Sequence, residues 1–322
     1  MEDSDVREIF GPLFDDPSPA NAFNVKKPLL AHYTTIQVLE RILETNEIWF
    51  SNPLFMNDLE EVRFGILEGN KLVLQSDEIA KACKTKERAS YFWHSFNHYF
   101  GQFDMQHIFD TYVFCMSEHE TYDNDGLLSM WRGYGANGNG VGIVFDTGQL
   151  SVVESSPLIM AAVAYETTEA RMAWLKQLIS RFVRILDTAN IPDEKFHLAA
   201  YWLFERIKLF ALFTKHHGFK EEREWRIVYL PDRDVHKKLH EMFSYAIGPR
   251  GIEPKLRFKI LPVEGVTAAD LSLTKIMERI IMGPSISSPM ALAMARRMFD
   301  RHGHLDLKPK LRPSTIPFRP LA

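Results

Sequence analysis

Cysteine is scarce in this sequence: Cys83 and Cys115 are the only two among 322 residues. Two thiols are too few for a disulfide framework or for a zinc site built on cysteine, and both are typical of buried thiols in a reducing compartment. Long apolar runs are absent as well. The longest uncharged one, residues 158–165, is far shorter than the ~20 residues that cross a bilayer.

An excess of either charge is also absent, because 38 Lys and Arg stand against 42 Asp and Glu, a net charge of −4. No global basic excess favours nucleic acid or a membrane surface, although a local patch can still bind either. Residues 1–16 are acidic and lack the basic start and apolar run of a secretory signal. We therefore expect a soluble, cytoplasmic protein without a membrane partner.

What is present is an ordinary globular composition, with 46% hydrophobic and 25% charged residues, which excludes a disordered chain, a collagen and a coiled coil. The following segments have the pattern of strands: 29–34, 47–51, 112–117, 140–146, 159–165, 224–230, 244–247, 256–260 and 276–282. The following segments have the pattern of helices: 36–43, 58–106, 168–188, 194–216 and 289–302.

This order of elements is not a regular alternation of strand and helix, so a doubly wound parallel sheet is not expected. The sequence predicts an α+β fold with a mixed or antiparallel core. We expect one elaborated domain over residues 1–322, with an N-terminal arm at 1–26 and helical insertions at 60–108 and 167–218.

Several sequence patterns fail a closer test. A calcium loop aligned on Gly126 would begin at Thr121 and end at Arg132, where acidic ligands are required. The glycine cluster at 133–140 lacks the Gly-Lys-Ser/Thr of a phosphate loop and leads into a strand instead of a helix. Neither His216–His217 nor the pair at 302 and 304 has metal-ligand spacing on a helix. The sequence therefore predicts no metal site.

Four polar clusters lie at predicted strand ends or turns, where a scaffold presents chemistry. They are His32-Tyr33-Thr34, Ser51-Asn52-Pro53 with Asn57-Asp58, Ser117 with Trp131 and Tyr134, and Glu222-Arg223-Glu224-Trp225-Arg226. Each contains side chains able to bind a ligand by hydrogen bonds, by charge or by ring stacking.

Together these residues form His-Tyr-Thr, Phe-x-Asn-Asp, Met-Trp-x-x-Tyr and Glu-x-Glu-Trp-Arg motifs spread over residues 29–318. In this pattern the chain resembles a large, uncharacterised bacterial family that looks like a divergent branch of the ADP-ribosyltransferase superfamily. The resemblance implies an ADP-ribosyltransferase-like β core and an enzyme that transfers ADP-ribose from NAD to a macromolecule. RNA or DNA is favoured over protein as the acceptor. The nearest analogues are toxins and phage-defence enzymes, for which a neutralising antitoxin protein would be a partner.

The resemblance assigns the first two signature positions to His32 and Tyr134. The ring of His32 would bond a ribose hydroxyl of NAD, and Thr34 would add a hydroxyl contact. The phenol of Tyr134 would stack on nicotinamide. Tyr33 is a rival for this stacking role, while Trp131 either shares a helical face with Tyr134 or packs in the core.

The resemblance assigns the third position to Glu224, whose carboxylate would stabilise the positive charge that develops on the ribose. Residues two apart on a strand point to the same side, so either Glu222 or Glu224 could serve. Members of the superfamily often carry two such residues spaced by two, the first of which handles the acceptor, so the resemblance assigns the acceptor to Glu222. Arg226 would hold the NAD diphosphate or pair with the glutamates. If Glu224 is purely catalytic, Glu224→Ala should leave the melting temperature nearly unchanged.

Asn52, Asn57 and Ser117 complete the set of cofactor-binding candidates. Asn57 and Asp58 also suit an Asx turn or a helix cap, which is the structural alternative to a role in a pocket. A non-enzymatic nucleic-acid- or nucleotide-binding module and an NAD glycohydrolase remain alternative functions. A metal-dependent nuclease is disfavoured, because no set of carboxylates or histidines surrounds one strand end.

Overall fold

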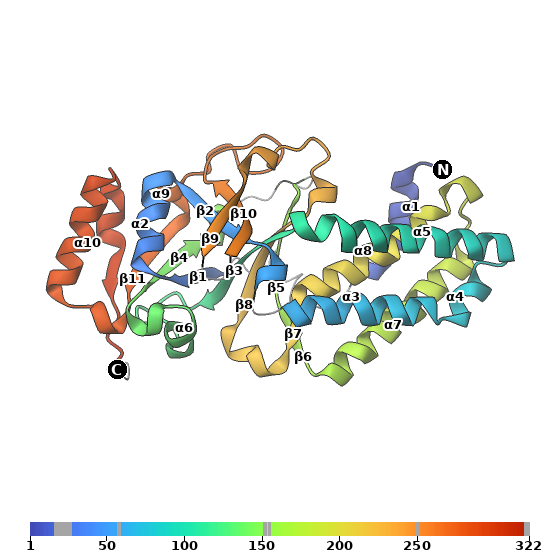
Figure 1. Ribbon diagram of the computed structural model, residues 1–322, viewed down its shortest axis with the longest axis horizontal. Helices are drawn as coiled ribbons and strands as arrows, with labels where there is room; N and C mark the ends of the chain where they lie inside the picture. Colours follow the sequence, from blue (N-terminus) through green and yellow to red (C-terminus); the bar gives the residue numbers. More distant parts are fainter. Residues whose placement is uncertain (16–27, 57–58, 151–152, 154–155, 249–250, 319–322) are drawn as a thin grey trace. The chain divides into compact units, whose positions relative to one another are not determined.

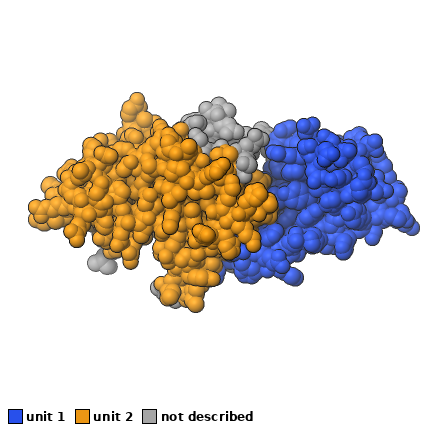
Figure 2. Space-filling model, turned by 90° about the horizontal axis from the view of Figure 1, so that it is seen from above, with its two compact units in different colours: residues 1–21, 53–111, 163–219 blue, residues 22–52, 112–162, 220–322 orange. Residues whose placement is uncertain are grey.

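The computed structural model describes residues 1–322 except 16–27, 57–58, 151–152, 154–155, 249–250 and 319–322. The chain forms two compact units (Figure 2). The helical unit comprises residues 1–21, 53–111 and 163–219, and the sheet unit comprises residues 22–52, 112–162 and 220–322. Among the described residues, every helix is too short or too polar to cross a membrane.

Within the described residues, the sheet unit has ten paired strands, most of which are labelled in Figure 1. They are β1 (Leu29–Thr34), β2 (Glu47–Ser51), β3 (Tyr112–His119), β4 (Val141–Asp146), β5 (Leu158–Ala162), β8 (Glu224–Tyr229), β9 (Phe243–Gly248), β10 (Gly251–Lys259), β11 (Met277–Met282) and β12 (Leu311–Pro313). The strand order is β12-β11-β4-β1-β3-β2-β10-β9, and β8 joins β3 and β5. Among the described residues, all these pairs are antiparallel except β11 with β12. The predicted α+β class with a mostly antiparallel sheet is confirmed.

The pairing splits at β3. Strand β8 follows one edge of β3 from Tyr112 to Ser117. On the other edge β2 pairs only at Val113, while β1 pairs at Ser117 and beyond. Strands β1 and β2 therefore diverge from each other beside Cys115, which lies between their two contacts with β3.

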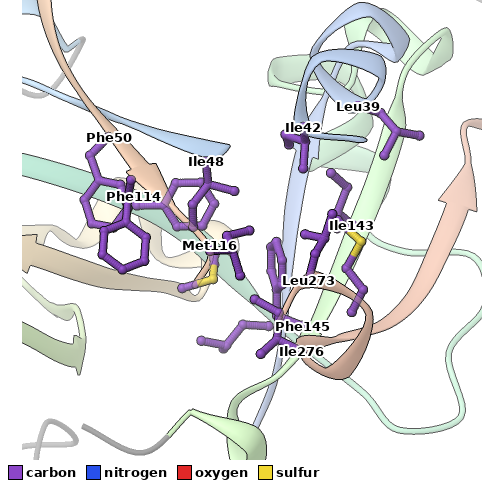
Figure 3. Close-up of a cluster of buried hydrophobic side chains, with 14 of the residues drawn as sticks. Leu39, Ile42, Ile48, Phe50, Phe114, Met116, Ile143, Phe145, Leu273 and Ile276 are labelled. Atoms are coloured by element: carbon purple, nitrogen blue, oxygen red, sulfur yellow. The ribbon is translucent and has the colours of Figure 1, made fainter. Parts of the chain in front are cut away.

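The two faces of the sheet carry different layers. One face bears the main core, in which Phe114 and Met116 pack with α2 (Ile36–Thr45), α9 (Leu273–Ile276) and α10 (Pro289–Arg301) (Figure 3). The other face bears a smaller cluster, in which Tyr33 packs against Trp131 of α6 (Leu128–Gly133). Thr35 begins α2 by accepting a hydrogen bond from the backbone N–H of Val38, as the sequence predicts.

In the part of the helical unit that the structure describes, there are five larger α-helices and one short one. They are α1 (Asp3–Phe10), α3 (Leu59–Leu74), α4 (Asp77–Ala82), α5 (Lys86–Met105), α7 (Thr168–Thr188) and α8 (His197–Phe213). Helix α8 is apolar on most sides and fits among α1, α3 and α5. Glycines allow α3 and α8 to approach closely, since a Cβ on Gly65 would lie 2.6 Å from Ala211 Cα.

Three predicted segments differ in the structure. Residues 3–10 form a helix where an arm is predicted; Glu2 and Asp5 make a capping box, and Val6 and Phe10 are buried. The predicted strand at 159–165 is two strands, β5 and β6 (Ala164–Glu166), which belong to different sheets. The predicted helix at 194–216 ends at Phe213, because residues 214–216 form β7 and pair with β6.

Candidate functional site

A buried ion pair lies at the start of β8. Glu224 and Arg226 are two residues apart on a strand, so their side chains point to the same face. Arg226 donates from Nε to Glu224 Oε1 at 2.8 Å and from Nη2 to Oε2 at 3.0 Å. Arg226 is 2% exposed and Glu224 is 5% exposed. Arg226 was predicted to hold the NAD diphosphate or to pair with the glutamates, and in the structure it pairs with Glu224.

Glu222 is held beside this pair in a different way. The expectation that it shares a strand face with Glu224 is wrong, because Glu222 ends a 3-10 helix (His217–Glu222) and Arg223 turns the chain with φ at +42°. Ser117 donates a hydrogen bond from Oγ to the Glu222 carbonyl oxygen at 2.5 Å. The partly exposed Glu222 carboxylate accepts one from Tyr134 Oη at 3.0 Å.

The ring of Tyr134 is accessible. Tyr134 follows the last residue of α6 and is 43% exposed, while its hydroxyl is oriented by Glu222. Ser117 pairs in register with Glu224, so strand β3 brings both glutamates to one end of the sheet. The structure therefore gathers five predicted site residues: Ser117, Tyr134, Glu222, Glu224 and Arg226.

Trp131 and Tyr33 are core residues. Trp131 is fully buried and donates from Nε1 to the Asp125 carbonyl oxygen at 2.8 Å. The Tyr33 ring packs edge-on against it at 4.9 Å, and Tyr33 Oη accepts a hydrogen bond from the backbone N–H of Leu127. Burial raises the pKa of Tyr33 to about 12. Neither ring presents a face to solvent, so of the two aromatic candidates for stacking only Tyr134 is accessible.

His32 lies apart from the glutamates, on the other face of the sheet. Its neighbour Ala31 pairs with Ser117, and paired residues share a face, so His32 points the opposite way. Its ring lies 4.6 Å from the ring of Phe114. His32 Nδ1 donates to the Cys115 carbonyl oxygen at 2.9 Å, at the point where β1 and β2 diverge. Burial lowers the pKa of His32, and the bond to Cys115 only partly offsets this, so the imidazole is neutral at pH 7.

Two of the remaining candidates, Thr34 and Asn52, are buried. Thr34 is buried on the same face as His32, and Asn52 is fully buried directly after β2. Asn57 and Asp58 lie outside the described residues. Their predicted part in a cofactor pocket stays a prediction.

The Asp123–Gly126 segment, which fails as a calcium loop, has a structural role. Asp123 Oδ1 accepts hydrogen bonds from the backbone N–H groups of Asp125 and Gly126. The Asp125 carboxylate in turn accepts from the backbone N–H and the hydroxyl of Thr315. Gly126 has φ at +75°, and a Cβ there would lie 2.7 Å from Tyr33 Oη. The segment thus anchors Thr315, a role that the Asx-Gly pattern alone did not indicate.

No group of three His, Cys, Asp or Glu side chains within the described part of the chain is arranged to hold a metal ion. The groups available for chemistry near the start of β8 are the Tyr134 phenol and the Glu222 carboxylate, because Glu224 and Arg226 are buried and bonded to each other. That arrangement suits a substrate on which positive charge develops.

Comparison with known proteins gives one match. Residues 130–227 match the model of a family described as "Protein of unknown function (DUF2971)". No curated protein and no solved structure matches the chain. The matched stretch runs from α6 to β8 and contains Tyr134, Glu222, Glu224 and Arg226, whereas His32 lies outside it. A match to an uncharacterised family agrees with part of the predicted resemblance.

Proposed function

We propose that the protein is an NAD-dependent ADP-ribosyltransferase that modifies a macromolecule, and that its sheet unit is an ADP-ribosyltransferase-like core. The observation that carries the proposal is the hydrogen bond from the exposed Tyr134 to the carboxylate of Glu222, which precedes the buried Glu224–Arg226 pair by two residues. An accessible aromatic ring and a fixed carboxylate are the two groups that nicotinamide–ribose cleavage needs.

Glu222 is the reacting carboxylate in this proposal. Both oxygens of Glu224 bond to the Arg226 guanidinium, and neither residue is more than 5% exposed. The resemblance favours Glu224 for the contact with NAD, whereas the solvent access of Glu222 favours Glu222 both for this contact and for taking up the acceptor's proton. The Glu224–Arg226 pair then has a positioning role, because it fixes the start of strand β8, which follows Glu222.

The reaction balances as a substitution at the ribose. The bond between ribose C1′ and the nicotinamide nitrogen breaks, and nicotinamide leaves with the bonding electrons. The Glu222 carboxylate stabilises the positive charge on the sugar by its own negative charge. A nucleophile of the acceptor then bonds to C1′ and gives its proton to Glu222. Tyr134 orients Glu222 through its hydroxyl and stacks on nicotinamide.

Nucleic acid is the acceptor class that the resemblance favours, and a toxin or phage-defence role with a neutralising antitoxin follows from the same resemblance. The resemblance also implies a contact between His32 and the NAD ribose, but His32 points to the other face of the sheet from Glu224 and is not part of the proposed site.

The test uses adenylate-labelled NAD with separate pools of RNA, DNA and cell protein. Wild-type protein should label one pool, and Glu222→Gln should lower that labelling at least 100-fold. Glu221→Gln is the matched control, because Glu221 is the exposed neighbour of Glu222 and should keep full activity.

Three outcomes decide between the functions. Label in a polymer that depends on Glu222 supports the transferase and identifies the acceptor class. Release of nicotinamide without labelled polymer indicates an NAD glycohydrolase. An absence of NAD cleavage in every pool refutes the proposal, and salt-dependent RNA binding by the same protein would then favour a binding module.

A further inference from the structure

Helix α5 of the helical unit (Figure 1) carries two histidines one turn apart. His94 and His98 are both exposed, whereas Phe92 and Phe96 are buried on the opposite side of the helix. A helix places residues i and i+4 on one face, with their Cβ atoms about 5–6 Å apart. The two imidazoles therefore project from the same face into solvent. The prediction of no metal site rests on other histidine pairs and did not weigh this one.

The ring nitrogens of this pair are available to a ligand. Within the part of the chain that the structure describes, neither imidazole makes a hydrogen bond or an ion pair, and His98 contacts the Tyr99 ring at 5.6 Å. The fold treats several other histidines differently, because a ring nitrogen of each bonds to a backbone group: these are His32, His119, His216 and His304. His94 and His98 thus keep their ring nitrogens for a partner from solution.

The charges along α5 also admit a cation. Lys86 and Arg88 lie in the first turn of the helix, and residues 89–105 contain neither lysine nor arginine. Asp104 is the one residue of that stretch with a carboxylate. A positive ion between the two imidazoles would therefore meet no fixed positive charge on its own stretch of helix.

We propose that His94 and His98 bind one divalent transition-metal ion of the Cu²⁺, Ni²⁺ or Zn²⁺ type. Imidazole suits these ions, whereas Mg²⁺ and Ca²⁺ require oxygen ligands. Two histidines at i and i+4 on a helix are the spacing that zinc metalloproteases use, but Ser95 stands where those enzymes carry the glutamate base. The pair therefore holds an ion without hydrolytic chemistry, and water completes the coordination shell.

The expected site is weaker than a structural or catalytic zinc centre, because such centres have three or four protein ligands. A bound ion would join two consecutive turns of α5 and so oppose unfolding of this helix. The proposal does not depend on the transfer reaction, since α5 belongs to the helical unit whereas Tyr134 and Glu222 belong to the sheet unit.

The first test titrates the untagged, metal-free full chain with NiCl₂ and, in parallel, with MgCl₂ by isothermal titration calorimetry. We expect one Ni²⁺ per chain and no saturable binding of Mg²⁺. His94→Gln and His98→Gln should each lower Ni²⁺ affinity by about tenfold or more, because even the loss of a group that only supports a ligand costs about that much. Glutamine is a good helix former, so both variants should keep the circular dichroism of the wild type.

The control is His236→Gln. His236 and His240 have the same spacing in the sequence, but they lie in turns beside Lys237 and Lys238 and do not share an α-helix. His236→Gln should therefore bind Ni²⁺ as the wild type does. Saturating NiCl₂ should raise the melting temperature of the wild type and of this control, and leave that of His94→Gln unchanged.

Three results overturn the proposal. The first is an absence of saturable Ni²⁺ binding to the wild type. The second is binding of Mg²⁺ as strong as that of Ni²⁺, which would indicate oxygen ligands. The third is Ni²⁺ affinity that both His94→Gln and His98→Gln retain, which would place the ion elsewhere on the chain.

Discussion

Removing the Glu224 carboxylate should destabilise the protein strongly. Glu224 and Arg226 are joined by two hydrogen bonds, and their side chains are 6% and 3% exposed. Removing one partner of a buried ion pair costs about 3–5 kcal/mol, because the other charge has already lost its water. Glu224→Ala should therefore lower the melting temperature by roughly 6–20 °C. This is the opposite of what a purely catalytic glutamate would do.

The assay is urea unfolding followed by circular dichroism, on the wild type, Glu224→Ala, Glu224→Gln, Arg226→Met and the double variant Glu224→Gln/Arg226→Met. Each single variant breaks the pair, whereas the double variant removes both charges, so its loss should be smaller than the sum by about 1–3 kcal/mol. Glu222→Ala is the control, since Glu222 is partly exposed and should cost less than about 1 kcal/mol. A wild-type urea midpoint for Glu224→Gln or Glu224→Ala would refute the reasoning.

Two further predictions concern stability. Burial raises the pKa of Tyr33 to about 12, whereas the unfolded tyrosine titrates near 10, so the folded state holds its proton longer. Stability should fall by about 2 kcal/mol as the pH rises from 10 to 12, and Tyr33→Phe should lack this fall when urea midpoints are compared across that range. Gly65→Ala should cost about 1–3 kcal/mol, because its Cβ would meet Ala211. Gly101→Ala on α5, where nothing lies within 4 Å, should stabilise by up to about 1 kcal/mol; equal midpoints for these two variants would contradict the close approach of α3 and α8.

Local sequence patterns predict most of the elements but not their partners. The apolar run at Leu29–Thr34 and the Asn-Pro that follows Ser51 mark β1 and the end of β2, because both signals are local. The pairing of β2 with β10 depends on residues as distant as Ser51 and Lys255, which are 204 positions apart. The helix at residues 3–10 was missed although its Glu2–Asp5 capping box is a local signal.

The candidate site was predicted in part for the same reason. Spacing alone places Glu224 and Arg226 on one face, and the structure agrees. The same rule fails for Glu222, because Arg223 adopts a left-handed backbone conformation. Glycine usually marks such a conformation in a sequence, and here the residue is an arginine. The separation of His32 from the glutamates depends on the register of Ala31 with Ser117, and register between distant strands leaves no trace in one sequence.

The late pairing of β2 has a consequence for synthesis on the ribosome. Lys255 is translated 204 residues after Ser51, which at ~5–20 residues per second is a delay of roughly 10–40 s. During that time the backbone of β2 lacks its long partner, while all segments of the helical unit are complete by Phe219. The nascent chain therefore carries β2 without its long partner for most of its translation, and chaperones that bind exposed apolar segments should influence how much protein reaches the folded state.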